Sequence, residues 1–151
     1  MSLTLDGQVI LPESRETVWS RLNDPEMMMK CIPGCQSAEE TENGYAVSAK
    51  VKIGVVKATF KGVVEMTEIE ENRKYRIEGR GDGGIAGFAK GGADVLLEDH
   101  PDGCMLTYEV DAQIGGKIAQ LGSRLVKGIA RRNADHFFES FLAELNQAAA
   151  A

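Results

Sequence analysis

Short stretches of alternating apolar and polar residues fill most of the first three quarters of the chain. Residues 3–11 place Leu3, Leu5, Val9 and Leu11 between mainly polar neighbours, which is the two-residue period of a strand with one buried face. The same period recurs between turn-forming residues in six further segments, residues 35–40, 45–53, 58–67, 75–81, 89–97 and 104–114. We therefore predict about seven strands, most of them joined by hairpins, with Gly54 interrupting the pattern.

Two helix-start signals follow the first strand. Ser14 is a favourable N-cap and predicts a short helix that ends near Leu22. Asp24-Pro25 combines an N-cap with proline at the first helical position, and it predicts a second short helix over residues 26–31. Pro33-Gly34 then ends the helix and predicts a type II turn in which Gly34 has a positive φ.

The last third of the chain changes to a helical period. Residues 117–147 form one long predicted helix, followed by a tail of four alanines at 148–151. Its apolar rows drift around the helix, so we expect it to cross a twisted sheet diagonally or to bend near Gly128. This order of elements predicts an α+β fold of the helix-grip type. A curved antiparallel sheet of about seven strands surrounds the long helix in a single domain, residues 1–147.

Small residues occupy many inward positions of the predicted sheet. They are Ala49, Ala58, Gly62, Gly79, Gly81, Ala89, Ala93 and Ala112. Because protein interiors pack nearly as densely as crystals, a solid core would need larger side chains there. We therefore predict an elongated apolar cavity of roughly 300 Å³ or more between sheet and helix.

Several short motifs resemble the carbon monoxide dehydrogenase G-subunit family of the START-like (SRPBCC) superfamily. They are Asp24-Pro25, residues 31–35 (CIPGC), Gly87-Phe88-Ala89 and residues 115–125 (GGKIAQLGSRL). The resemblance covers essentially the whole chain. It implies a helix-grip domain with a hydrophobic tunnel. It also implies that the partner is a molybdenum hydroxylase of the carbon monoxide dehydrogenase type, and that the protein serves in the maturation or membrane attachment of that enzyme.

The overall charge excludes some functions. The 151 residues contain 17 Lys and Arg against 23 Asp and Glu, a formal charge of −6, which argues against nonspecific nucleic-acid binding. The sequence contains no run of 18 uncharged apolar residues and no secretory signal pattern. We therefore expect a cytoplasmic protein. We extend this expectation to peripheral contact with the inner face of the membrane.

The predicted cavity is the candidate binding site for a hydrophobic small molecule, lipid or quinone-like. We place four residues at its mouth: Trp19, Met27, Met28 and Ile32. Ten residues are predicted to line it: Phe60, Val64, Ile77, Phe88, Ala93, Val95, Tyr108, Ala112, Leu121 and Leu125. Flexible thioethers in residues 27–29 suit a gate that accepts varied apolar shapes, although packing in the core explains them equally well.

Signals for catalysis or cofactor binding are weak, so we predict a non-catalytic carrier without a cofactor. Cys31 and Cys35 lack the other half of a zinc site, and with Cys104 they form an odd set that fits packed thiols better than disulfides. The glycine-rich residues 79–92 lie between strands rather than before a helix, unlike a nucleotide loop. A cyclase- or hydrolase-like enzyme and an assembly factor with an incidental cavity are the alternatives.

The first half of the long helix carries a basic stripe. Lys117, Arg124, Lys127 and Arg131 fall in one arc, which we predict to face outward. One interpretation is a solvated face paired with acidic neighbours, which contributes little to stability. The other is a surface that docks on anionic lipid headgroups or on an acidic partner.

Overall fold

The computed structural model describes residues 1–53 and 55–150. Gly54, where the sequence predicts an interruption, and Ala151, the last residue of the predicted tail, lie outside the described residues. The side chains of Ile53 and of residues 148–150 lie outside them as well.

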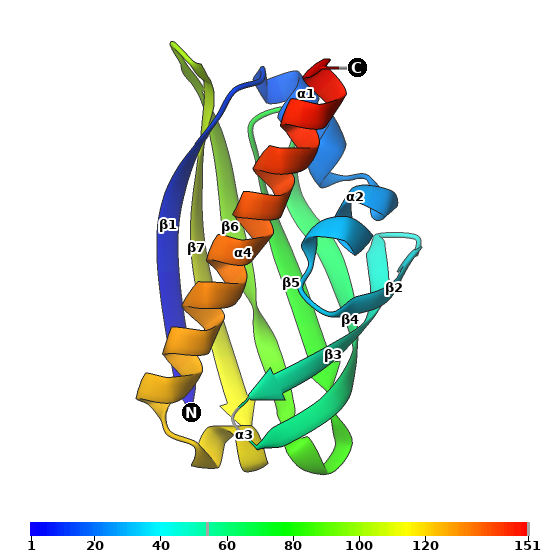
Figure 1. Ribbon diagram of the computed structural model, residues 1–151, viewed down its shortest axis with the longest axis vertical. Helices are drawn as coiled ribbons and strands as arrows, with labels where there is room; N and C mark the ends of the chain where they lie inside the picture. The colour runs from blue at the N-terminus through cyan, green and yellow to red at the C-terminus, as the bar shows by residue number, and fades with distance from the viewer. Residues whose placement is uncertain (54, 151) are drawn as a thin grey trace.

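Seven antiparallel strands form one curved sheet in the order β1-β7-β6-β5-β4-β3-β2 (Figure 1). All but β1 follow one another as neighbours, and β1 closes the other edge by pairing with β7. The strands are β1 (Ser2–Leu11), β2 (Cys35–Glu40), β3 (Gly44–Ile53), β4 (Val56–Glu70), β5 (Lys74–Asp82), β6 (Phe88–His100) and β7 (Gly103–Gly115). The predicted α+β fold with one curved sheet is confirmed.

Two short helices connect β1 to β2, and both begin at the predicted caps. The Ser14 side chain accepts a hydrogen bond from the Thr17 N–H at the start of α1 (Arg15–Leu22). The Asp24 carboxylate accepts one from the Glu26 N–H, 3.0 Å away, at the start of α2 (Pro25–Cys31). These caps satisfy donors that the first turn of a helix leaves free.

The turn between α2 and β2 has the predicted geometry. Gly34 has a φ of 73°, and the Cys35 N–H donates to the Ile32 carbonyl at 3.1 Å, as in a type II turn. The Gly34 carbonyl also accepts from the Lys50 N–H at 2.9 Å. The turn therefore fixes α2 against β3 and positions the helix over one end of the sheet.

The C-terminal helix starts later than predicted. A separate turn of helix, α3 (Lys117–Gln120), precedes α4 (Ser123–Ala150), so the prediction of one helix from residue 117 is wrong. Gly122 breaks the chain with a φ of 95°, and its N–H donates to the Ala119 carbonyl in a tighter turn. From there α4 runs unbroken through Gly128 and lies diagonally over the sheet (Figure 1). A 3₁₀ turn, η1 (Gly84–Ala86), which was not predicted from the sequence, joins β5 to β6.

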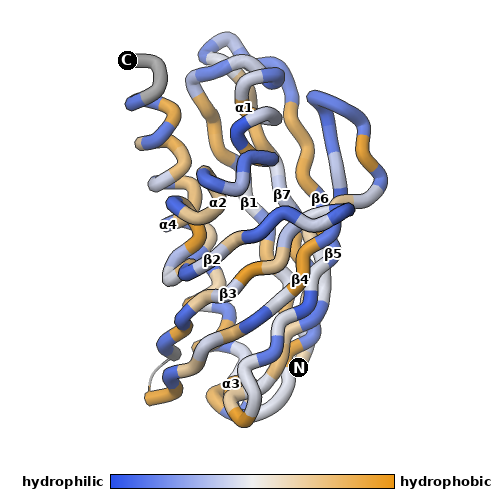
Figure 2. Tube along the Cα trace, turned by 90° about the vertical axis from the view of Figure 1, so that its right-hand side faces the viewer, coloured by the Kyte–Doolittle hydropathy of each residue, from blue (hydrophilic) through white to orange (hydrophobic). Residues whose placement is uncertain are grey.

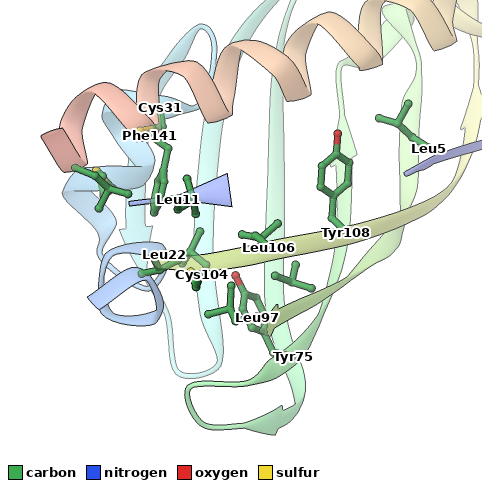
Figure 3. Packing of buried hydrophobic residues seen from close by; sticks show 14 residues of the cluster. Leu5, Leu11, Leu22, Cys31, Tyr75, Leu97, Cys104, Leu106, Tyr108 and Phe141 are labelled. Atoms are coloured by element: carbon green, nitrogen blue, oxygen red, sulfur yellow. The ribbon is translucent and has the colours of Figure 1, made fainter. Parts of the chain in front are cut away.

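Two apolar clusters join α4 to the sheet. The larger surrounds Phe141 and Leu145, which are almost fully buried, and also contains Leu22 and Cys31 of the short helices and Leu106 of β7 (Figure 3). The smaller contains Leu3, Ile114, Ile118 and Val126, near α3. Hydrophobic and hydrophilic residues alternate along the strands (Figure 2), so each strand contributes one face to these clusters.

Candidate ligand-binding site

An apolar cavity of about 310 Å³ lies between the sheet, α2 and α4. Its walls come from the inward face of five strands and from three helices. The helical residues are Leu22, Met28, Ile32, Ala134, Phe137 and Phe138. The strand residues are Tyr45, Val47, Val64, Met66, Tyr75, Ile77, Ala93, Val95, Leu106, Tyr108 and Val110. Its size lies at the lower end of the range for small-molecule sites.

A more open apolar stretch of about 340 Å³ continues from this cavity along the inward face of the sheet. Both stretches share Val47, Val64, Ile77, Ala93 and Val110 as wall residues. The open stretch adds, toward the smaller cluster, Ala49, Phe60, Ala89 and Ala112 together with several glycines. The elongated shape expected from the small inward residues is therefore present.

The glycines of this stretch have two different structural roles. A Cβ at Gly79 would lie 3.6 Å from the nearest atoms, and one at Gly81 would lie 3.9 Å away, which is ordinary van der Waals contact, so a methyl group would fit at both positions. A Cβ at Gly62 would lie only 2.7 Å from the Arg80 carbonyl oxygen, and one at Gly91 would collide with the Asp111 carbonyl. Gly62 and Gly91 are needed because the backbone of a neighbouring strand approaches them closely, rather than to keep a cavity open.

Most of the predicted site residues surround this space. Seven of them line the cavity of about 310 Å³: Met28, Ile32, Val64, Ile77, Ala93, Val95 and Tyr108. Phe60 and Ala112 line the open stretch, together with Val64, Ile77 and Ala93. Their role in binding a ligand stays a prediction.

Three predicted lining residues lie elsewhere. Phe88 is 50% exposed and its ring covers Gly115 on the outer face, because Ala89 is the residue of β6 that faces inward. Leu125 is 44% exposed on α4. Leu121 packs in the smaller cluster, because the break at Gly122 removes it from the line of α4. Helical periodicity extended across residues 117–125 therefore misplaced both leucines.

The residues predicted for the mouth divide between cavity and core. Met27 is 1% exposed within the larger cluster, Met28 lines the cavity and Met29 is exposed. Trp19 packs behind the cavity wall, with its ring edge against Tyr75 at a centroid distance of 5.1 Å. Of the three methionines, only Met28 lies where a gate would need it. Met27 fits the other interpretation, packing in the core.

Several wall residues on α4 and two tyrosines were not predicted from the sequence. Phe137 and Phe138 face the cavity, and Phe138 stacks on Tyr108 with ring centroids 5.3 Å apart. Tyr45 and Tyr75 stood at predicted inward positions of their strands but were not assigned to the site. The alternation of apolar and polar residues in their strands was the sequence signal that could have identified these two tyrosines as wall residues. Figure 3 shows Tyr108 rising from β7 toward α4.

The cavity beneath α4 presents almost only carbon to a ligand. Among the described residues that line it, none carries a carboxylate, imidazole or amine. Burial raises the pKa of both Tyr45 and Tyr75, so their phenols stay neutral at physiological pH. Arg131 donates a hydrogen bond to the Tyr108 hydroxyl at 3.1 Å. Such a wall can bind a ligand by burying its apolar surface, with neutral phenols as hydrogen-bonding groups.

The cysteines are free thiols. Cys31 and Cys104 are buried and Cys35 is half-buried. Burial raises the pKa of Cys31 to about 11, which keeps this thiol protonated and unreactive. The described residues contain no cluster of three or more His, Cys, Asp or Glu side chains suited to a metal ion.

The basic stripe expected on one helix is divided. Lys117 lies on α3, across the break from Arg124 and Lys127, which are exposed on α4. Arg131 is half-buried and bonded to Tyr108, so its predicted outward position is wrong. Within the described residues, no helix is both long enough and apolar enough to cross a membrane.

Comparisons with solved structures agree with this architecture. A conserved protein from Geobacillus kaustophilus is 31% identical, with a TM-score of 0.89 and 97% of each chain covered. A START superfamily protein from Mycobacterium smegmatis is 17% identical, with a TM-score of 0.66 and coverage of 97% of this chain and 98% of the other. The Zhui aromatase/cyclase from Streptomyces sp. R1128 is 12% identical, with a TM-score of 0.67 and coverage of 99% and 96%. The last two show likeness of fold alone.

Sequence comparison adds the family. No curated protein sequence matches the chain, whereas the family model of CoxG, the carbon monoxide dehydrogenase G-subunit, matches residues 7–146. The START-like fold with its apolar cavity is that of a hydrophobic ligand-binding domain. One long helix covers a curved sheet, an apolar space lies beneath that helix, and the family model matches nearly the whole chain. The protein therefore belongs to the carbon monoxide dehydrogenase G-subunit (CoxG) family.

Proposed function

We propose that this protein is a non-catalytic carrier that binds a lipid or quinone-like molecule in the cavity beneath α4. The observation that carries the proposal is the apolar cavity of about 310 Å³ beneath α4, whose wall residues are almost all hydrophobic. The open stretch beyond it lengthens the site along the sheet, which suits an elongated ligand better than a compact one.

The expected affinity comes from the hydrophobic effect. A ligand that buries on the order of 200 Å² of its apolar surface gains about 5 kcal/mol at about 25 cal/mol per Å². The ligand's loss of translational and rotational freedom offsets part of this gain, whereas a preformed cavity adds little further cost because little of the protein must be ordered on binding. The carrier role requires such intermediate affinity, since the cargo must leave again.

The wall chemistry supports carriage over catalysis. General acid–base catalysis needs groups whose pKa lies near the working pH, whereas the polar groups of the cavity beneath α4 are phenols, two of which have raised pKa values. As partner we propose a molybdenum hydroxylase of the carbon monoxide dehydrogenase type. Membership in the CoxG family supports this choice.

The test is to identify what the protein carries. Protein purified without detergent is measured by native mass spectrometry, and the bound material is then extracted into organic solvent. We expect a bound species of small mass that is retained in the native spectrum and lost on denaturation. Protein that is empty, and that also fails to bind the neutral apolar probe N-phenylnaphthylamine, would contradict the proposal.

A cavity-filling variant makes the test specific. Ala93 borders both stretches, so Ala93→Phe should occupy the space and abolish probe binding with little loss of stability. In a packed core the same change would cost about 1–3 kcal/mol. Thr59→Phe is the matched control, because Thr59 is exposed on β4 and its neighbour Phe60 faces inward. The control should bind the probe as the wild type does.

A further inference from the structure

Positive charge is concentrated at one end of the molecule, which we call the basic end. It comprises residues 50–61, 83–90 and 117–128, which contain eight of the chain's 17 cationic residues and none of its 23 acidic residues. The eight are Lys50, Lys52, Lys57, Lys61, Lys90, Lys117, Arg124 and Lys127. In a chain with a net charge of −6, this segregation gives the molecule a strong charge asymmetry.

The three segments meet in space. β3 and β4 pair up to the turn between them, so Lys52 lies opposite Lys57. The 3₁₀ turn η1 contacts both β4 and α3. Figures 1 and 2 show α3, the β3–β4 turn and the N-terminus at the same end of the molecule. The N-terminal ammonium adds a further positive charge there, where it donates to the Ile114 carbonyl.

The eight cations are available for an external partner. All eight are exposed, and none forms an ion pair with another described residue. Elsewhere several cations form ion pairs within the protein, as where Arg76 bonds Glu78, Asp94 and Asp111 on the outer face of the sheet. Acidic residues border the basic end. Asp82 accepts a hydrogen bond from the Gly84 N–H at 2.7 Å and lies opposite Lys61 in the strand register without an ion pair. Lys127 lines a hollow together with Asp6, Asp94, Glu109 and Asp111.

Apolar side chains project from the same end. Val55, in the β3–β4 turn, is 94% exposed and Ile85, in η1, is 84% exposed, the two highest values among the exposed large hydrophobic residues described. Leu125, between two cations of α4, is 44% exposed. Isolated exposed hydrophobic residues are ordinary, but here two strongly exposed tips lie at the same end of the molecule as the unpaired cations. This combination is typical of surfaces that bind at a membrane interface.

We propose that the basic end docks the protein on an anionic lipid bilayer, with Val55 and Ile85 among the headgroups and the cations at the phosphates. Protruding tips enter a soft lipid layer directly, whereas a protein partner would need a matching pocket for each. The acidic remainder of the chain is repelled by the same surface, so the charge asymmetry also fixes the orientation. This docking goes beyond the carrier function and does not depend on it.

The test is flotation of the whole protein with vesicles. We expect binding to vesicles that contain phosphatidylglycerol at low salt, weaker binding as salt rises, and none to phosphatidylcholine alone, because salt screens such charges. Each cation near an anionic surface should contribute about fivefold to the partition coefficient. The double variant Lys52→Glu/Lys57→Glu should therefore lose binding by more than tenfold.

Two further variants separate charge from insertion. Lys30→Glu/Lys74→Glu makes the same change in net charge away from the basic end and should bind nearly as the wild type does. Val55→Ser/Ile85→Ser should weaken binding while its salt dependence stays the same. Melting curves check that each variant is folded.

Three outcomes would overturn the docking proposal: no binding of the wild type to phosphatidylglycerol vesicles at low salt, equal losses in the two charge-reversal variants, or binding only to an acidic protein. N-phenylnaphthylamine binding serves as the independent readout of the cavity, and the Lys52→Glu/Lys57→Glu variant should retain it. Loss of probe binding in Ala93→Phe with vesicle binding intact would show that the two sites are separate.

Discussion

The guanidinium of Arg131 on α4 donates a hydrogen bond to the Tyr108 hydroxyl of β7 at 3.1 Å. The Tyr108 ring also stacks on Phe138 of the same helix. Gly7 lies opposite Tyr108 on β1, and a Cβ there would collide with the Tyr108 ring and hydroxyl. The sheet therefore makes room for one tyrosine that reaches the covering helix through both its ring and its hydroxyl.

Replacing this hydroxyl tests how much the bond contributes. Tyr108→Phe keeps the stacked ring and leaves the half-buried guanidinium without its acceptor. We expect a loss of about 1 kcal/mol in the free energy of unfolding, measured by urea denaturation. In an Arg131→Ala background the same change should cost much less, because the partner is gone. Equal losses in both backgrounds would mean that the bond adds nothing.

The turn at Gly34 should tolerate no side chain. Its φ of 73° is strained for other residues by about 1–2 kcal/mol, and a Cβ would collide with the Lys50 carbonyl. Gly34→Val should therefore lower the melting temperature by several degrees. Gly128→Ala is the control, because a Cβ there meets no atom within 4 Å in α4, and it should raise stability by about 0.5–1 kcal/mol. An unchanged melting temperature in Gly34→Val would contradict the assignment.

Gly79 and Gly91 lie opposite each other on β5 and β6, yet they should respond differently to the same substitution. A Cβ at Gly79 would make ordinary van der Waals contacts without a collision, so Gly79→Ala should leave stability unchanged or slightly higher. A Cβ at Gly91 collides with the Asp111 carbonyl, so Gly91→Ala should cost about 2 kcal/mol or more. Chemical denaturation of the two variants measures both losses in the free energy of unfolding, and equal losses would show that a methyl group does not fit at Gly79.

Cys31 should make stability depend on alkaline pH. Burial raises the pKa of its thiol to about 11 in the folded protein, whereas an unfolded thiol titrates near a pKa of about 8.5. The stabilisation is fully present below the unfolded pKa and is lost as the pH rises toward 11, because only the unfolded chain releases the proton. Cys31→Ala should show a shallower decline of unfolding free energy over this window. Identical slopes for the two proteins would exclude the thiol as the cause.

Much of the fold could be predicted because it depends on local rules. Alternation identified the strands, Ser14 and Asp24-Pro25 identified the starts of the two helices, and small inward residues indicated the cavity. The break at Gly122 was missed because glycine is tolerated inside helices, as Gly128 is in α4. Whether a glycine breaks a helix depends on what packs around it, and one sequence does not contain that information.

The site was harder to predict than the fold. Phe88 was assigned to the cavity wall although its neighbour Ala89 has the inward position, and strand pairing strictly decides which of two adjacent residues faces inward. Phe137 and Phe138 are adjacent on α4 and both face the cavity, which a single helical stripe does not anticipate. Arg131 shows the same limitation, because its partner Tyr108 is 23 residues away in sequence.

The unequal size of the two apolar clusters gives α4 a gradient of local stability. Fourteen buried residues form the larger cluster around its C-terminal half, whereas four form the smaller one beside Gly122. Because local opening costs less where fewer apolar contacts must be broken, amide hydrogens near Val126 should exchange sooner than those near Phe141. We therefore expect the covering helix to lift first at its N-terminal end while its other end stays in place, which would widen the apolar stretch next to the smaller cluster without unfolding of the domain.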